Sequence, residues 1–236
     1  MKTLRASNGP FTERPFYKHE EIESISLYEL HASGLLPSVP QPIRVDRFLE
    51  KRFGVTPQYE DLAQGLLGVT VFGEKGVETI IIARALDDEG TKVAERRIRS
   101  TMAHEAGHGL LHAHLFGPRE KTQPLFGDFS DPHRPKILCR NDAIQGYDPR
   151  PAYDGRWWEF QANSIMGCLL LPRPLVEKAL ETFLVVRGSL GDRMIDNARR
   201  PKAIRHVSEL FDTNPVVAKL RIDGMFPADN EAQLAL

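Results

Sequence analysis

The segment Arg99-Ser-Thr-Met-Ala-His-Glu-Ala-Gly-His-Gly-Leu-Leu-His112 contains an H-E-x-x-H pattern made by His104, Glu105 and His108. In a helix, residues four positions apart lie on one face, about 6 Å apart along the axis. Two imidazoles at this spacing can reach one zinc ion, and Glu105 beside them can deprotonate a water molecule at the open side of the metal. A buried helix whose histidines only make hydrogen bonds would show the same pattern, so a further ligand is needed.

The residues around this pattern favour a helix. Met102, Ala106 and Leu110 recur at intervals of four, as on the apolar face of a helix. Gly107 and Gly109 argue mildly against it, because each costs about 1 kcal/mol relative to alanine in a helix. Such glycines are understandable if another backbone or the metal passes close to them.

Two kinds of third ligand are possible. A metzincin pattern would place a histidine at His114, which is present, but its required glycine position holds Leu111. We therefore expect the helix to continue, which puts His114 about 15 Å and His112 about 12 Å from His104 along the axis. Both are rejected as direct ligands. Glu159, at the start of a second apolar segment, would complete a His2Glu site with a fourth position left for water.

At these two segments the chain resembles the ImmA/IrrE-like zinc metallopeptidases, over roughly residues 40–225. That family shows R-F-x-x-A-H-E-x-G-H-x-x-x-H followed by E-x-x-A-x-x-F-A-x-x-L-L-x-P. The departures, Ser100 and Ile165-Met166, fall on packing positions. The matching residues are Arg99, Ala103, His104, Glu105, Gly107, His108, His112, Glu159, Ala162, Leu169, Leu170 and Pro172.

The resemblance implies an α+β fold of the zincin-like class, in which a small sheet packs on the H-E-x-x-H helix and on the helix that carries Glu159. It implies one Zn²⁺ per chain, held by His104, His108 and Glu159, with Glu105 as the catalytic base. Members of the family typically cleave or inactivate a helix-turn-helix transcriptional repressor, often after a stress signal. We therefore expect a gluzincin-like metalloprotease whose partner is such a repressor, in a stress or mobile-element response.

Two other functions remain open. The chain could be a non-catalytic regulator that contains zinc and acts by protein contact. It could also bind DNA through a helix-turn-helix-like pair at residues 203–211 and 216–222, although the second helix offers only Lys219 and Arg221. The presence of Glu105 favours the enzyme, since a structural zinc needs no general base and closes its fourth position with a protein ligand.

Composition limits the choice of partner and compartment. The 236 residues carry 31 Lys and Arg against 32 Asp and Glu, a net charge of -1, so nothing indicates a nucleic-acid or anionic-membrane partner. The two cysteines form no C-x-x-C pair, the N-terminus is polar, and no apolar run reaches membrane length. We expect a cytoplasmic protein with reduced cysteines.

Three regions are expected along the chain. Residues 1–42 form an N-terminal extension, lying along the surface or disordered up to residue 18, with a helix at 19–32. Residues 43–175 form the peptidase core, with a loop insertion at about 115–155. Residues 176–236 form a C-terminal helical region packed on the core, and a helix over 175–186 leads into it.

Within the core we expect a helix at 43–53 closed by Gly54, and strands at 55–59, 67–72 and 78–83. The strand at 78–83 either edges the active-site cleft, where an extended substrate could add to it, or is an ordinary core strand.

Four residues are candidates for supporting roles. His133, Tyr147 and Tyr153 in the insertion are the available donors for the oxyanion. His112 would support the site from outside the ligand set or simply pack, and packing is favoured. The two tryptophans directly before Glu159 are expected to anchor its helix in the core.

Overall fold

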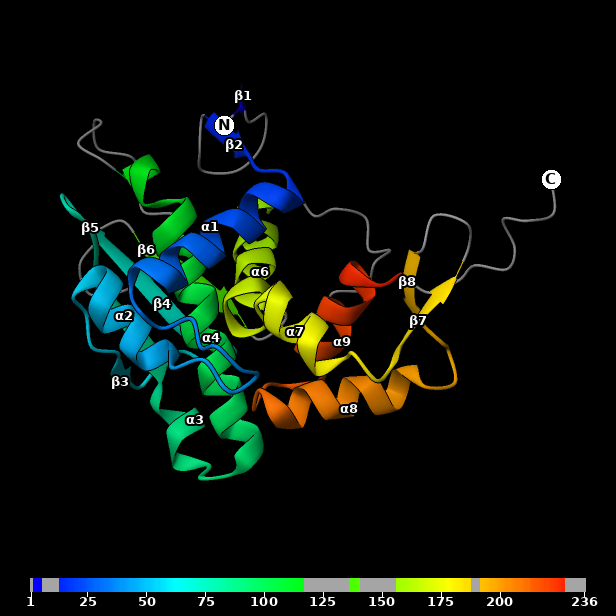
Figure 1. The fold of residues 1–236 in the computed structure, drawn as a ribbon. Coiled ribbons are helices and arrows are strands. Elements are labelled where there is room, and N and C mark those ends of the chain that lie inside the picture. Colours follow the sequence, from blue (N-terminus) through cyan, green and yellow to red (C-terminus); the bar gives the residue numbers. More distant parts are fainter. Residues whose placement is uncertain (1, 6–12, 117–135, 141–155, 188–191, 228–236) are drawn as a thin grey trace.

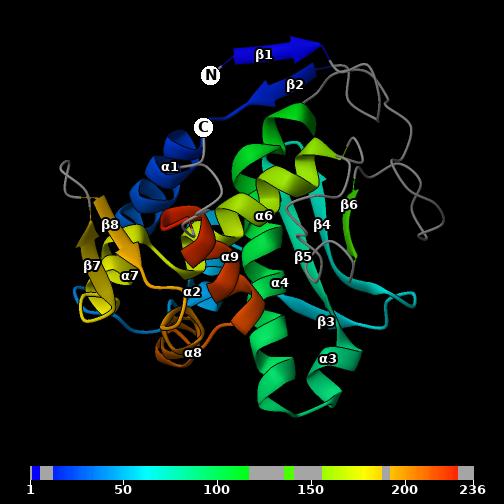
Figure 2. The same ribbon diagram turned by 90° about the vertical axis from the view of Figure 1, so that its right-hand side faces the viewer.

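A computed structural model of the chain describes residues 2–5, 13–116, 136–140, 156–187 and 192–227. It is a mixed α+β structure with one four-stranded sheet and two two-stranded hairpins among these residues. The α+β class predicted from the sequence is therefore confirmed. Helix α4 (Lys92–Leu111) lies between the sheet and helix α6 (Trp157–Leu170), as Figures 1 and 2 show. In the part of the chain that the structure describes, no helix has the length and apolar character needed to span a bilayer.

The four-stranded sheet has the order β3-β5-β4-β6. The tightly connected pair β4 (Leu66–Gly73) and β5 (Gly76–Ala83) is antiparallel, with β3 (Gln58–Glu60) parallel to β5 and β6 (Lys136–Arg140) antiparallel to β4. Alternate residues of a strand face opposite sides of a sheet. Gly68 and Thr70 of β4 face α4, where both lie against Glu105.

The position of β5 bears on the two interpretations of this strand. Residues 78–83 are a strand as predicted, and β5 pairs with β4 over residues 76–82 and with β3 over residues 81–83. The ladder with β3 covers Ile81, Ile82 and Ala83, so these residues have the two partners of an ordinary core strand. An added substrate strand along residues 76–80 stays a prediction. Beside β4 the edge is β6, which lies inside the segment predicted to be a loop insertion.

Helix α4 begins at the N-cap Thr91, whose hydroxyl accepts from the backbone N–H of Ala94. It ends at Leu111, and a 3₁₀ turn, η1 (Ala113–Phe116), follows. The prediction that the helix runs on through residue 114 is therefore wrong. The Phe116 ring stacks on Phe72 of β4, with centroids 4.3 Å apart, and this contact holds the chain in its turn toward the sheet.

Two further helices pack against α4 and α6. Helix α1 (His19–Ala32) matches its predicted range. Helix α2 (Val45–Phe53) begins at Val45 instead of the predicted residue 43, and it ends at Gly54 with a φ of 71°, in the left-handed region that glycine adopts without strain. Helix α1 packs on α6 and α2 packs on α4. Trp157 and Trp158 at the start of α6 are buried against Phe72 and Ile137, which confirms their predicted anchoring role.

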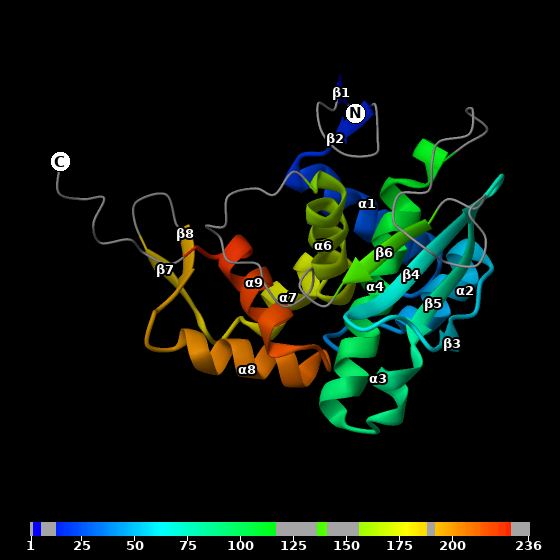
Figure 3. The ribbon, with the colours of Figure 1, turned by 180° about the vertical axis from the view of Figure 1, so that it is seen from behind.

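The C-terminal region differs from its prediction at one point. Helix α7 (Arg173–Ala179) ends early, and the chain then forms the hairpin of β7 (Leu184–Arg187) and β8 (Asp192–Ile195). The prediction of a helix over 175–186 is therefore wrong. The segment Leu184-Val-Val contains two β-branched residues, which favour a strand. Helices α8 (Arg200–Leu210) and α9 (Pro215–Met225) form the predicted pair, and α9 packs on α6 (Figure 3).

Two further elements complete the description. A short helix, α3 (Arg84–Asp88), connects the sheet to α4. Near the N-terminus, β1 (Lys2–Arg5) and β2 (Glu13–Phe16) pair as antiparallel strands, at the top of Figure 2. The sequence analysis did not predict this pair, because two four-residue strands are too short to show a reliable period.

Candidate metal centre

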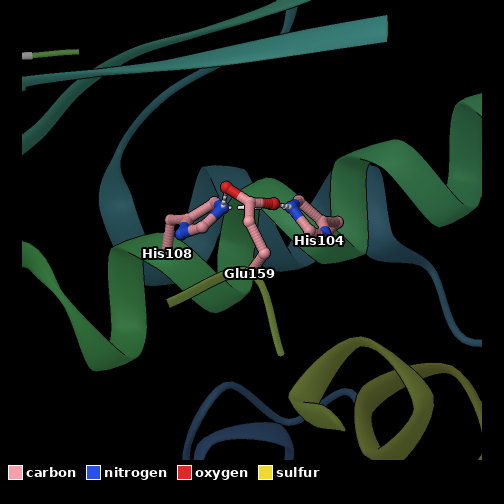
Figure 4. A group of neighbouring side chains, drawn as sticks. All are labelled: His104, His108 and Glu159. Atoms are coloured by element: carbon pink, nitrogen blue, oxygen red, sulfur yellow. Dashed lines mark hydrogen bonds and ion pairs between the residues drawn. The ribbon is translucent and has the colours of Figure 1, made fainter. Parts of the chain in front are cut away.

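Helices α4 and α6 bring His104, His108 and Glu159 together, and Figure 4 shows the three side chains pointing at one another. Their ligand atoms all lie within 4.8 Å of one another. The two Nε2 atoms are 3.0 Å apart. The Glu159 carboxylate reaches across both rings, with Oε2 3.1 Å from His104 Nε2 and Oε1 3.7 Å from His108 Nε2.

This group is buried and incompletely hydrogen-bonded. Both histidines are 0% exposed and Glu159 is 7% exposed. Despite its distance of 3.1 Å from His104, Glu159 Oε2 has no partner in hydrogen-bond geometry, and neither does Oε1 of the neighbouring Glu105. Unpaired buried acceptors are costly, and a cation among them removes that cost. Two imidazoles and a carboxylate are also the donor set of catalytic zinc sites, so these residues fit a metal ion.

Glycines in α4 let the neighbouring elements approach this closely. A Cβ on Gly107, between the two histidines, would lie 2.5 Å from Ile165 Cγ2 and 3.0 Å from the carbonyl oxygen of Ala162. A Cβ on Gly109 would lie 2.8 Å from Phe53 Cζ. Both glycines therefore lie where another segment packs closely against α4. At Gly107 that segment is α6, the helix that carries Glu159.

Glu105 lies beside the three ligands and is not part of their group. The Thr70 hydroxyl of β4 donates to its Oε2, and a Cβ on Gly68 would lie 2.6 Å from its Oε1. Burial raises the pKa of Glu105 to about 8, although His104 and Thr70 act in the opposite direction. One oxygen is thus held by the sheet, and the other is left without a partner in a site that excludes solvent.

The outer nitrogens of both histidines are engaged. His104 Nδ1 lies 2.9 Å from Asn163 Oδ1, and His108 Nδ1 lies 3.0 Å from His112 Nδ1. His112 Nε2 in turn lies 3.0 Å from Gln161 Oε1. Burial lowers the pKa of His112 to about 3, so its ring is neutral. His112 also packs edge-on against a tryptophan, but its contact with His108 means that it does more than pack.

Cys139 of β6 is a neighbour that the sequence analysis did not identify. Its Cα is paired with that of Gly68, and its buried thiol interacts with the His104 side chain. Burial raises the pKa of this thiol to about 11. No spacing in the sequence signals the contact, because it depends on β6 pairing with a strand some 70 residues earlier.

The remaining candidates separate into two groups. His114 is exposed on the 3₁₀ turn and does not belong to the ligand group, in agreement with its rejection. His133, Tyr147 and Tyr153 lie outside the described residues, so they receive no structural role.

The two basic residues that could contact DNA in the alternative reading both form ion pairs within the protein. Arg221 is buried and pairs with Glu23, with nitrogen–oxygen distances of 2.6 and 2.7 Å. Lys219 pairs with Asp223 one turn further along α9, at 2.6 Å. Arg221 therefore holds the tail to α1 and offers no charge to a phosphate backbone, which adds to the argument against DNA binding by this helix pair.

Comparisons with models of known protein families and with curated proteins found no match for this chain. The chemistry of the centre is therefore inferred from its geometry, together with the motif resemblance described above.

Proposed function

We propose that this protein is a zinc-dependent metallopeptidase that cleaves a protein substrate. The observation that carries the proposal is the convergence of His104, His108 and Glu159 on one buried point. Glu105, whose Oε1 has no hydrogen-bond partner, follows His104 directly on α4. A metal held by three protein ligands keeps a position for water or substrate, whereas structural zinc sites are closed by four protein ligands.

Each residue has a distinct task in this proposal. Zinc, when bound, supplies a Lewis acid that polarises the scissile carbonyl and lowers the pKa of water. Glu105 takes a proton from the attacking water and delivers it to the departing amine. The Thr70 hydroxyl occupies Oε2 of Glu105, which directs this work to Oε1. Burial of the whole group keeps bulk water away from the reacting atoms.

The resemblance to the ImmA/IrrE-like peptidases supports a more specific substrate. We propose a helix-turn-helix transcriptional repressor, cleaved in a stress or mobile-element response. The near-neutral charge of the chain and the engaged cations of α9 favour a protein partner over direct contact with DNA.

The test is the variant Glu105→Gln, which keeps the size of the side chain but cannot accept a proton at neutral pH. Its zinc content should match that of the wild type, because Glu105 is outside the ligand group. Cleavage of a helix-turn-helix repressor encoded beside this gene should slow about 10²–10⁴-fold, the usual effect of losing a general base. The fragments would be followed by mass spectrometry.

A matched control is Ser164→Ala, which removes a hydroxyl that donates to the carbonyl of Phe160 within α6, the helix of Glu159. It should cleave at the wild-type rate. If Glu105→Gln loses zinc, Glu105 is a ligand and its role as base is wrong. If cleavage is absent in the wild type while the cellular response survives in Glu105→Gln, the protein acts by contact and not by proteolysis.

A further inference from the structure

His108 has an unusual partner on its outer nitrogen. Metal-binding histidines generally donate that N–H to a carboxylate, a backbone carbonyl or water. Here the partner is the ring of His112, and the contacts continue from it to Gln161 and then to Pro15 of β2. His108, His112 and Gln161 are all buried, at 0%, 0% and 5% exposure. The metal centre is thereby connected to the N-terminal strand pair by an unbroken series of hydrogen bonds.

The direction of this series is fixed at its outer end. The carbonyl oxygen of Pro15 can only accept, and it lies 2.7 Å from Gln161 Nε2. The amide nitrogen of Gln161 must therefore face Pro15, which turns Oε1 toward His112, 3.0 Å from its Nε2. An amide oxygen also only accepts, so His112 Nε2 must carry the proton.

The same reasoning continues into the metal centre. A neutral imidazole carries one N–H, so His112 with its proton on Nε2 has a lone pair on Nδ1. His108 Nδ1, 3.0 Å away, must then donate to it. A neutral His108 that donates from Nδ1 keeps its lone pair on Nε2, the atom that converges with His104 and Glu159. The opposite order would put a proton on the ligand atom.

We propose that Gln161 and His112 are positioning residues that hold His108 in its metal-binding tautomer, and that the Pro15 carbonyl of β2 sets the direction of this relay. The proposal rests on the proposed metal site and adds a control element to it. Displacing β2 frees the Gln161 amide to rotate, which removes the preference for the correct tautomer. Because coupling between two sites is reciprocal, zinc binding also holds β2 in place.

Two variants of one residue separate the relay from a simple structural contact. Gln161→Leu removes both hydrogen bonds, and zinc affinity, measured by competition with a chromophoric chelator, should fall about 10–100-fold, as for other outer partners of metal ligands. Gln161→Glu still offers an oxygen to His112 Nε2, but its carboxylate opposes the Pro15 carbonyl. It should keep zinc affinity close to that of the wild type, while proteolysis within residues 1–18 becomes faster. Ser164→Ala on the same helix is the control and should change neither quantity.

If both Gln161 variants lose zinc equally, Gln161 only holds the N-terminal strand and the relay is wrong. If Gln161→Leu binds zinc as tightly as the wild type, the relay is also wrong.

A second measurement does not depend on zinc or on activity. In metal-free wild-type protein labelled with ¹⁵N-histidine, long-range ¹H–¹⁵N spectra should show the His112 proton on Nε2 and the His108 proton on Nδ1. A His112 proton on Nδ1 would overturn the relay. A wild-type protein that binds no zinc would overturn the proposed function, and the tautomers would still decide the relay. The charge that Gln161→Glu introduces does not affect this test, because it is made on the wild type.

Discussion

Helix α6 takes part in two buried polar clusters that differ in how completely their groups are paired. In the first, the guanidinium of Arg221 binds both oxygens of Glu23, and its Nε donates to the carbonyl of Leu171 at the end of α6. In the second, the candidate metal centre, oxygens of Glu105 and Glu159 are buried without a hydrogen-bond partner. Buried polar groups in native proteins are nearly always paired. The difference separates a cluster that holds helices together from one that is built for a ligand.

The pKa values of the carboxylates also differ between the two clusters. Burial alone would raise the pKa of Glu23, but the hydrogen bond and charge of Arg221, with a smaller effect of Arg173, lower it. Burial raises the pKa of Glu105 to about 8, and the contacts with His104 and Thr70 do not reverse it. The charge of Glu23 is balanced by Arg221, so this carboxylate has a structural role. The charge of Glu105 is not balanced in this way, so its carboxylate is suited to accept a proton.

The largest expected effect comes from breaking the paired cluster. Arg221→Met leaves the Glu23 carboxylate buried with only the longer contacts to His19 and Arg173, both at 3.4 Å. The free energy of unfolding in urea should fall by about 3–5 kcal/mol, the usual cost of stranding one member of a buried pair. Zinc affinity should stay at the wild-type value, because Arg221 does not contact the metal centre.

Lys219→Met is the control on the same helix, since it breaks an exposed pair with Asp223. It should cost about 0.3–0.5 kcal/mol. If Arg221→Met costs no more than this control, the buried pair does not hold α9 to α1.

Zinc should complete the unpaired cluster and stabilise the fold. A ligand that binds only the folded state at 100 times its dissociation constant adds about 2.7 kcal/mol. We expect one zinc per chain by elemental analysis and this gain in urea unfolding, both for the wild type and for Glu23→Gln. Glu159→Ala should lose most of the metal and the whole gain. Full metal occupancy in Glu159→Ala would remove Glu159 from the ligand set and reopen His112, His114 and His133 as candidates.

The contact between α4 and α6 can be tested at Gly107. An alanine Cβ would overlap Ile165 and press on the carbonyl of Ala162, so the two ligand-bearing helices must separate. Overpacking of this kind costs about 1–3 kcal/mol. Gly107→Ala should lower stability by this amount and weaken zinc binding as well. Lower stability with unchanged zinc affinity would show that the ligand geometry tolerates the separation.

The sequence was informative where the information is local. Helix α1, the cap at Gly54 and the H-E-x-x-H helix follow from periodicity and from single residues, and α1 has the predicted limits. The structure also brings together the three residues named as ligands, two of them from one helical spacing and Glu159 from the second motif. These signals need only a few neighbouring residues to be read.

Other features depend on contacts between distant segments. Strand β6 and the hairpin β7–β8 are four or five residues long, so their periods are too short to identify. Thr70 holds Glu105 across 35 residues of sequence, and Gln161 meets Pro15 across 146. No sequence pattern assigns Gln161 or Pro15 a role at the metal site, because the relay exists only after the N-terminal strand has packed against α6.

The smallest expected effect concerns a glycine of α9, the helix that carries Arg221. Gly224 lies in α9, one turn beyond Arg221, is exposed, and a Cβ there would have no atom within 4 Å. Its φ is not in the left-handed region, so alanine fits the existing backbone. Gly224→Ala should raise the free energy of unfolding by about 0.5–1 kcal/mol, because alanine loses less conformational freedom than glycine in a helix. Zinc affinity should not change. Opposite signs for Gly107→Ala and Gly224→Ala would show that close packing, and not helix propensity, requires the glycine between the two histidines. If both substitutions lower stability, close packing does not explain the difference between the two glycines, and the expectation for Gly224 is wrong.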